Sequence, residues 1–310
     1  MTRIKIQVKT EVDGVPRPQA VEPRPGRPMK ADTAFLPIAL GTALVAVALL
    51  VGLLTWIPGV LIGPPAMQGS ARGTALIVVV AALLSVAGML IARRGQIAGL
   101  MLWLGAVAYL LYNAVLFLFA TPYNRLFLLD VAFLALAIFT LISLVMVART
   151  QTASQSLRGR RWLAGYIWAV VVLNAVAWLS RIIPSLLSDR PESITDGMGV
   201  ATNPVYVQDL GFWLPTAAVI GWWLWSGRAI GIVLAGGLLS FGVLESVSIA
   251  VDQALGVAAD PSSPVVSTVL IPGFVVLGAT QALVLVLHVR SVRSTPRAPA
   301  QGSRGRPAHP

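Results

Sequence analysis

Eight long apolar runs, separated by short polar breaks, are the feature that most constrains this chain. A helix that crosses a bilayer needs roughly 20 largely apolar residues, because its backbone must satisfy its own hydrogen bonds where water is absent. We place the runs near 33–57, 74–92, 97–119, 125–148, 162–187, 205–226, 229–253 and 266–289. The predicted fold is therefore all-α, a polytopic transmembrane helical bundle of about eight spans.

The composition agrees with this fold class and excludes several kinds of site. Of 310 residues, 56% are hydrophobic and only 11% are charged, which is too apolar for a soluble domain of this length. The chain has no cysteine, and its only histidines are His288 and His309. Disulfides, thiolate clusters, a bis-histidine haem and a histidine-rich zinc site are thus excluded. We expect no cofactor and no metal.

The basic residues predict the orientation of the spans. Alternate compartments that include both tails hold 19 of the 23 Lys and Arg residues, whereas the opposite compartments hold four. Bacterial inner membranes retain Lys and Arg on the cytoplasmic side, so both termini are expected to be cytoplasmic. The expected location is the bacterial inner (plasma) membrane, with the protein in contact with the lipid bilayer. The net charge of +11 does not indicate nucleic-acid binding, because it is spread over tails and short loops.

Three regions follow from this pattern. Residues 1–32 form a basic, proline-rich tail, residues 33–290 form the eight-span domain, and residues 291–310 form a second basic tail rich in Pro, Arg, Gly and Ser. Neither tail has enough apolar residues to bury a core, so both are predicted to be disordered and cytoplasmic.

The fourth and sixth runs share the pattern N-x2-aromatic-x2-D-x2-F. It occurs as residues 124–133, with Asp130, and as residues 203–212, with Asp209. Both copies begin outside and run inward, which suggests a parallel repeat of helix hairpins. Asn is a favoured N-cap, so the two asparagines are interpreted as helix starts. The aspartates lie six residues further on, about 9 Å into the helix, where a carboxylate needs a partner or water.

Other embedded polar residues fall in the same outward half of the bilayer. Tyr112 and Asn113 lie beyond the midpoint of the third run, and Glu245 and Asp252 share one face of the seventh run with Ser248. Two arginines, Arg125 and Arg181, also lie near this level. We expect the ligand-binding residues to converge on an outward-facing cavity; they are Asp130, Asp209, Glu245, Arg181, Asn113, Tyr112 and Asp252. The alternative for Arg125, Arg181 and Asp252 is that they reach the outer interface and bind nothing specific.

Two segments carry a resemblance to known sequences. The stretch from Tyr112-Asn113 through residues 123–128, and residues 203–210, resemble uncharacterised polytopic membrane proteins of GC-rich bacteria. The use of 20 Arg against 3 Lys agrees with such a source. The resemblance implies a multi-pass architecture and carries no activity to any residue.

Three functions remain open on these observations. The first is a transporter or permease-like protein whose outward carboxylates bind a cation, a proton or a small polar solute. The second is a non-enzymatic sensor or assembly module that uses the loop 188–204 to bind a ligand or another membrane protein; the sequence identifies no protein partner. The third is a lipid-modifying membrane enzyme with an acidic acid/base residue. The enzyme ranks last, because no nucleophile, metal ligand set or phosphate clamp accompanies the acids.

Overall fold

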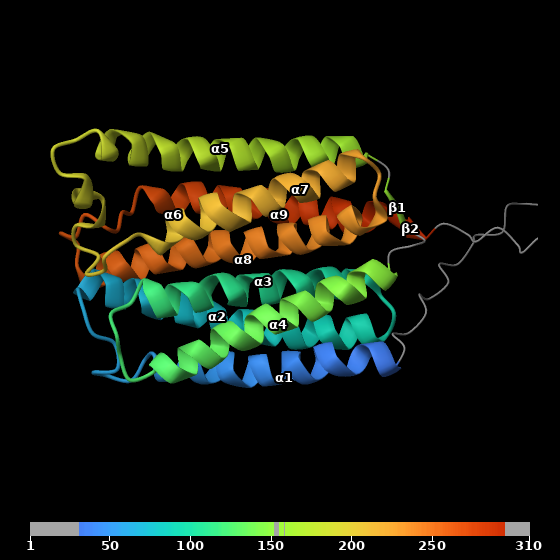
Figure 1. Ribbon diagram of the computed structural model, residues 1–310, viewed down its shortest axis with the longest axis horizontal. Coiled ribbons are helices and arrows are strands. Elements are labelled where there is room, and N and C mark those ends of the chain that lie inside the picture. Colours follow the sequence, from blue (N-terminus) through green and yellow to red (C-terminus); the bar gives the residue numbers. More distant parts are fainter. Residues whose placement is uncertain (1–30, 152–154, 158, 295–310) are drawn as a thin grey trace, which may run out of the picture.

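The computed structural model describes residues 31–151, 155–157 and 159–294, and these form a bundle of long helices (Figure 1). Most of the two predicted tails, 1–32 and 291–310, lies outside the described residues, so their predicted disorder is not tested. Seven helices are long and apolar enough to cross a membrane. They are α1 (Ala31–Leu54), α2 (Pro65–Arg93), α3 (Ile97–Phe119), α4 (Phe127–Gln151), α5 (Arg160–Leu186), α8 (Ala229–Ala259) and α9 (Leu270–Ser291). The chain is therefore a multi-pass helical membrane protein.

The sixth predicted run is helical throughout but divided into three pieces. These are α6 (Pro204–Gln208), the π-helical turn η2 (Asp209–Trp213) and α7 (Leu214–Trp225). In the π turn, the Leu214 N–H donates to the Asp209 carbonyl, five residues back instead of four. Pro215 explains the break, because it has no N–H for the carbonyl of Gly211 and its ring needs space in that turn. The segment crosses the bundle once, but no single helix within it reaches the length of a span.

Both ends of the described bundle lie on the same side, as an even number of crossings requires. In Figure 1, α1 begins and α9 ends at the right, while the loop with the short helix η1 (Pro191–Thr195) lies at the left. The structure adds two short strands that the all-α prediction did not include. At the right-hand end, β1 (Gln155–Leu157) pairs antiparallel with β2 (Val292–Ser294). We refer to the left and right ends as the outer and inner ends, following the orientation predicted by charge.

Two helices are longer than predicted. Helix α2 begins at Pro65 instead of 74, and α8 continues to Ala259 instead of ending at 253. The added segment of α2 contains Gly69 and Gly73, which lie directly against the backbone of α8. Their lack of a side chain permits this close approach, although the same glycines made the segment look like a loop in sequence.

Helix α3 lies at the centre of the bundle, and α5 and α9 lie at its edge. Of the most apolar stretch of each helix, 72% is buried in α3 but only 17% in α5 and in α9. Helix α3 packs against α2, α4 and α8. Gly105 of α3 and Gly237 of α8 lie in this contact, so the small residues of α8 serve close helix packing. A polar residue on α3 is thus held far from lipid.

Candidate functional site

Glu245 of α8 is the centre of a buried polar cluster in the outer half of the bundle. Its carboxylate lies within electrostatic range of Asp209 and Asp252, and next to the Asn113 side chain. Ser248 follows one turn later on the same face of α8 and accepts a hydrogen bond of 2.8 Å from the Tyr109 hydroxyl of α3. The predicted stripe on α8 therefore faces α3, and it brings Glu245 and Asp252 together with Tyr109 and Asn113.

Asp209 reaches this cluster from the π turn of the sixth segment. It is 7% exposed, and its Oδ2 accepts a hydrogen bond of 2.8 Å from Trp178 Nε1 of α5. Tyr112 of α3 lies beside it. The neighbouring Gln208 donates from Nε2 to the Tyr112 carbonyl at 3.4 Å, which ties the interrupted segment to α3. Asp209 thus contacts residues of two other helices at the point where its own helix is irregular.

Aromatic rings close one side of the cluster. The Trp213 ring stacks on Phe241 with centroids 4.9 Å apart and an interplanar angle of 12°. Tyr112 packs against both rings at 5.9 and 5.7 Å. Trp213 also donates from Nε1 to Gln208 Oε1 at 3.3 Å. These rings are large and rigid, so they fix the backbone around Asp209 and limit access of water from that side.

No basic side chain neutralises these carboxylates in the part of the chain that the structure describes. Arg125 and Arg181 are both exposed, and neither forms an ion pair there. The ion pairs found join Arg190 to Glu192 and Asp196 in the outer loop. The exposed position of Arg181 agrees with the alternative in which this residue reaches the outer interface. At the end of α5 the long side chain extends to the surface, where its charge stays solvated.

The cluster contains unfilled hydrogen-bonding capacity. Glu245 Oε2 is buried and has no hydrogen-bond partner in the described segments, whereas Asp252 Oδ1 accepts from Gln253 Nε2 at 2.9 Å. Burying several negative charges side by side without a counter-charge costs several kcal/mol per ion by general estimates. The arrangement therefore favours the binding of positive charge, such as protons on the carboxyl groups, although the three acids do not form a group suited to a metal ion among the described residues.

Asp130 does not join this cluster. It is 1% exposed on α4, and among the described residues its Oδ1 has no hydrogen-bond partner and no other charged group interacts with its carboxylate. Helix α4 packs mainly against α1 and α3, on the side of α3 away from the sixth segment. The structure therefore brings Asp209, Glu245, Asp252, Tyr112 and Asn113 together and places Asp130 and Arg181 apart from them, while ligand binding by these residues stays a prediction.

Of the two shared asparagines, Asn203 caps a helix as expected: its Oδ1 accepts from the N–H groups of Val205 and Tyr206 at the start of α6, at 3.0 and 3.4 Å. Asn124 lies three residues before α4, and its Oδ1 accepts from the Leu126 N–H at 2.8 Å in the turn that leads into the helix. Both asparagines are followed six residues later by a buried aspartate. This local likeness explains the shared pattern, while a duplication of whole hairpins stays a prediction.

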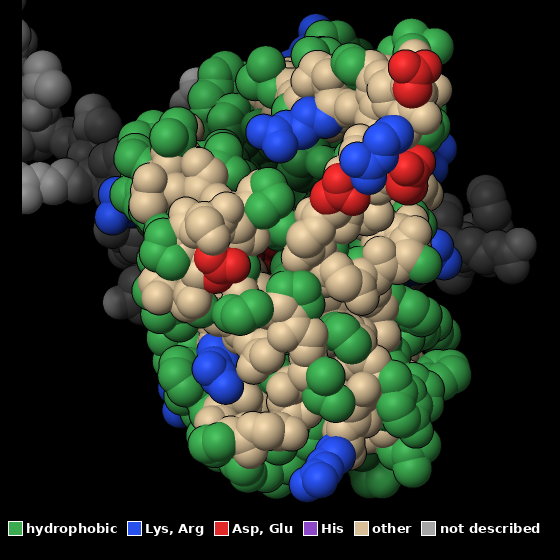
Figure 2. Space-filling view, turned by 90° about the vertical axis from the view of Figure 1, so that its left-hand side faces the viewer, with side chains coloured by type: hydrophobic (Ala, Val, Ile, Leu, Met, Phe, Trp, Pro, Cys, Tyr) green, Lys and Arg blue, Asp and Glu red, His purple; other side chains and the backbone are tan. Residues whose placement is uncertain are grey.

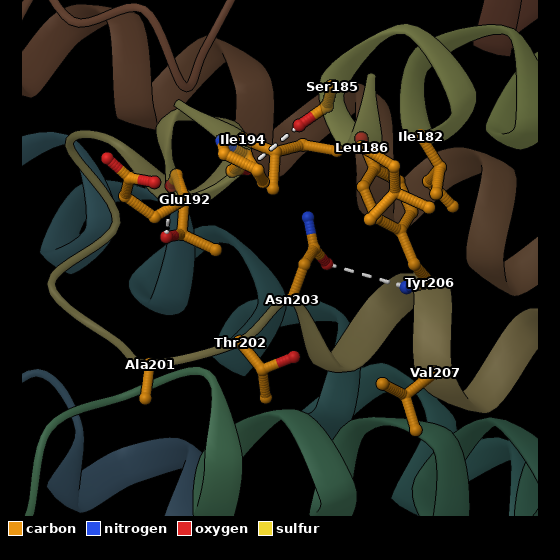
Figure 3. A pocket seen from close by; sticks show the side chains of 12 residues that line it. Ile182, Ser185, Leu186, Glu192, Ile194, Ala201, Thr202, Asn203, Tyr206 and Val207 are labelled. Atoms are coloured by element: carbon orange, nitrogen blue, oxygen red, sulfur yellow. Dashed lines mark hydrogen bonds between the residues drawn. The ribbon is translucent and has the colours of Figure 1, made fainter. Parts of the chain in front are cut away.

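A groove of about 270 Å³ opens beside the cluster at the outer end of the bundle. Figure 3 shows Ile182, Ser185 and Leu186 of α5 on one side, with Asn203 and Val207 opposite. The groove is closed above by η1, which Ser185 holds by donating to the Pro191 carbonyl at 2.8 Å. Tyr206 lies at its base, with its ring centroid 4.9 Å from that of Trp178. Tyr206 therefore lies between the groove and Trp178, the residue that binds Asp209.

The loop above the groove contains charged residues that interact with one another. A hydrogen bond from the backbone N–H of Glu192 and the nearby Arg190 guanidinium lower the pKa of Glu192 below its usual value. Figure 2 faces this end and shows acidic and basic side chains in small groups between polar and apolar surface. No group of three His, Asp or Glu residues suited to a metal ion occurs among the described residues. The outer end thus offers neither a continuous charged surface nor a metal site in the described segments.

Several residues of the site were not identified from sequence. Gln208 precedes the π turn, Trp213 is its last residue, and Phe241 supports it from α8. Gln208 could have been found, because an amide in an apolar run needs a partner inside the bundle. The π turn itself has no sequence signal beyond Pro215. Comparison of the chain with protein-family models, curated proteins and solved structures finds no match.

Proposed function

We propose that this protein is a transporter or permease-like membrane protein whose outer carboxylate cluster binds a positively charged cargo. The observation that carries the proposal is the grouping of Asp209, Glu245 and Asp252 without a basic partner among the described residues. Buried carboxylates in a membrane bundle are costly, and they typically mark the path of an ion, a proton or a polar solute. The proposed setting is the bacterial inner membrane, with the groove facing outward.

The interrupted sixth segment supports the same proposal. Transporters commonly place their binding residues on helices that are broken within the membrane, because the irregular turn frees backbone groups and allows movement. Asp209 is the first residue of the π turn, and it is held by Trp178 from another helix. A carboxylate at a break of this kind can move from one set of contacting residues to another with only a small change of the backbone conformation.

Flux in proteoliposomes tests the proposal. The purified protein is reconstituted with an internal pH-sensitive dye, and uptake of protons, radiolabelled sodium ion and guanidinium is followed in separate experiments. Asp209→Asn and Glu245→Gln each remove a negative charge at nearly constant size, so both should lose most of the flux of whichever probe is carried. Proton flux alone would identify a proton pathway, whereas guanidinium or sodium flux would identify a cation site.

Asp130→Asn is the matched control for these variants. It makes the same chemical change at a carboxyl group that is also buried but lies apart from the cluster. It should retain wild-type flux. Equal flux in wild type, Asp209→Asn and Glu245→Gln, or an equal loss in Asp130→Asn, would contradict the proposed site.

A second candidate function is a non-enzymatic membrane sensor, and the groove is the observation that favours it. Hydroxyl and amide groups of Ser185, Thr195, Thr202 and Asn203 line it beside apolar side chains, which suits a small amphipathic ligand. A sensor would show ligand-dependent thermal stabilisation that is lost when the loop 188–204 is replaced, and it would show no flux.

A further inference from the structure

We propose that α5 is the outer gate of the carboxylate site, and that the hydrogen bond from Trp178 to Asp209 is the latch that keeps it closed. This inference rests on the proposed transport function, since it concerns access to the same carboxylates. It assigns a role to the outer two-thirds of α5, which is poorly buried, and to the groove at the outer end of this helix. The groove is then the route by which a cationic cargo reaches Asp209.

The packing of α5 is concentrated at one end. Its only buried residues are Leu163, Ala164 and Ile167, all in the inner third of the helix. Helix α5 packs mainly against α7, and from residue 168 onward none of its residues is buried. Large apolar side chains such as Leu173 and Leu186 are 70% and 66% exposed. The outer two-thirds therefore has little contact energy to hold it in place.

The inner end, by contrast, has a firm anchor. Trp168 donates from Nε1 to the Ala218 carbonyl at 3.1 Å and lies over Gly221, where any side chain would collide with its ring. Its ring centroid is 5.6 Å from that of Trp225, and the Arg161 guanidinium lies 5.3 Å above the Trp225 ring on the same α7. These contacts form a pivot about which the outer part of α5 can tilt.

The outer end has two ties to the rest of the bundle. One is the hydrogen bond from Trp178 to Asp209, supported by the contact between the Trp178 and Tyr206 rings. The other joins Ser185 to the loop at Pro191, which itself follows α5 in the chain. Asn174 Oδ1 is buried on α5 without a hydrogen-bond partner, so the closed arrangement leaves a polar atom unsatisfied. Within the described part of the chain, only the first tie connects α5 to the carboxylate cluster.

The latch responds to the cargo through simple electrostatics. An ionised carboxylate is a stronger hydrogen-bond acceptor than a carboxylate neutralised by a proton or a bound cation. Binding of positive charge at Asp209 therefore weakens the bond to Trp178. The gate is closed over an empty site and loosened when the site is filled, which couples occupancy to opening.

Spin-label distances measure the movement directly, because the chain contains no cysteine and introduced cysteines are unique. One pair spans the outer end, Leu186→Cys on α5 and Leu128→Cys on α4, both at exposed positions. The control pair spans the inner end, Gly165→Cys and Met146→Cys on the same two helices. Distances are measured by double electron–electron resonance in lipid nanodiscs, with and without Trp178→Phe.

Trp178→Phe keeps an aromatic ring against Tyr206 and removes only the N–H donor. The outer pair should gain a second distance population, and the inner pair should not change. From residue 168 to 186 the helix is about 27 Å long at 1.5 Å per residue, so a tilt of about 10° displaces the outer label by about 5 Å. Asp209→Ala should produce the same population, and the double variant should add nothing.

Three results would overturn the gate. The first is an outer distance that is unchanged in both Trp178→Phe and Asp209→Ala, and the second is an equal change at the two ends, which would indicate general loosening. The third is a short distance between Leu186 labels of two chains that Trp178→Phe does not alter, because a second copy would then cover α5.

The gate experiment does not depend on a measurement of flux. If Glu245→Gln loses flux but the outer distance does not change in Trp178→Phe, the gate alone is refuted. If the outer distance changes in Trp178→Phe but Glu245→Gln keeps normal flux, the transport site alone is refuted.

Discussion

Replacement of Gly73 by alanine tests how closely α2 and α8 must approach to form the carboxylate site. A Cβ atom at Gly73 would lie 2.7 Å from the Cα atom and 2.9 Å from the N atom of Asp252. Ordinary van der Waals contact begins at 3.4 Å, so the two backbones must separate by several tenths of an ångström. Neither neighbour is a flexible side chain that could turn aside. Overpacking of this kind costs about 1–3 kcal/mol.

Gly165→Ala is the matched control, because nothing lies within 4 Å of a Cβ atom at that position of α5. Both variants gain the same helix propensity, about 1 kcal/mol relative to glycine, so their difference isolates the packing cost. We expect Gly73→Ala to be less stable than Gly165→Ala by about 1–3 kcal/mol. Unfolding is followed by tryptophan fluorescence in mixed micelles with an increasing fraction of sodium dodecyl sulfate.

Equal stability of the two variants would refute the reasoning, because it would show that α2 and α8 do not touch at this point. The variant also bears on function. Since the collision is with the backbone of Asp252 itself, Gly73→Ala should displace that carboxylate and lower flux, whereas Gly165→Ala should not.

Three further predictions concern the start of α6, the outer loop and the inner end of α5. Asn203→Ala leaves two N–H groups at the start of α6 without their side-chain acceptor, and it should lower the free energy of unfolding by about 0.5–2 kcal/mol in the same micelle assay. Arg190→Gln should move the pKa of Glu192 back up towards its usual value, as measured by carboxyl-carbon NMR. Because that pKa is lowered in the folded protein, the associated stabilisation is present above the usual value of 4.5 and is lost as the pH falls through the lowered pKa; a pKa of Glu192 that does not respond to Arg190→Gln would contradict the ion pair. Trp168→Phe removes the hydrogen bond at the proposed pivot, so it should change the inner spin-label distance more than the outer one. A larger change of the outer distance would contradict a pivot at Trp168.

Much of the architecture could be predicted because lipid imposes a simple rule on sequence. Each span must be apolar along its length, and seven of the eight predicted runs correspond to single long helices. The predicted helix bounds are wrong where a helix contains polar or small residues in place of apolar ones. The start of α2 contains Gln68, Gly69 and Arg72, which look like a loop until α8 is known to cover them.

The site was predictable in part for a related reason. Glu245, Ser248 and Asp252 share a face by helical spacing, and that face does meet α3. Which helices are neighbours cannot be derived from spacing within one helix, however. Asp130 was grouped with Asp209 because their local sequences match, yet α4 and the sixth segment lie on different sides of α3. Arg181 was grouped by its depth, although its direction around α5 was unknown.

The π turn at Asp209–Trp213 has a consequence for the evolution of this segment. Such a turn accommodates one residue more than an α-helical turn, so the residues before it are rotated by about 100° relative to a continuous helix. Loss of a single residue within 209–213 would restore the regular helix and change the angular phase of everything on its outer side. Homologues with a deletion there would keep the same span and the same aspartate in an alignment, but their carboxylate would point in another direction.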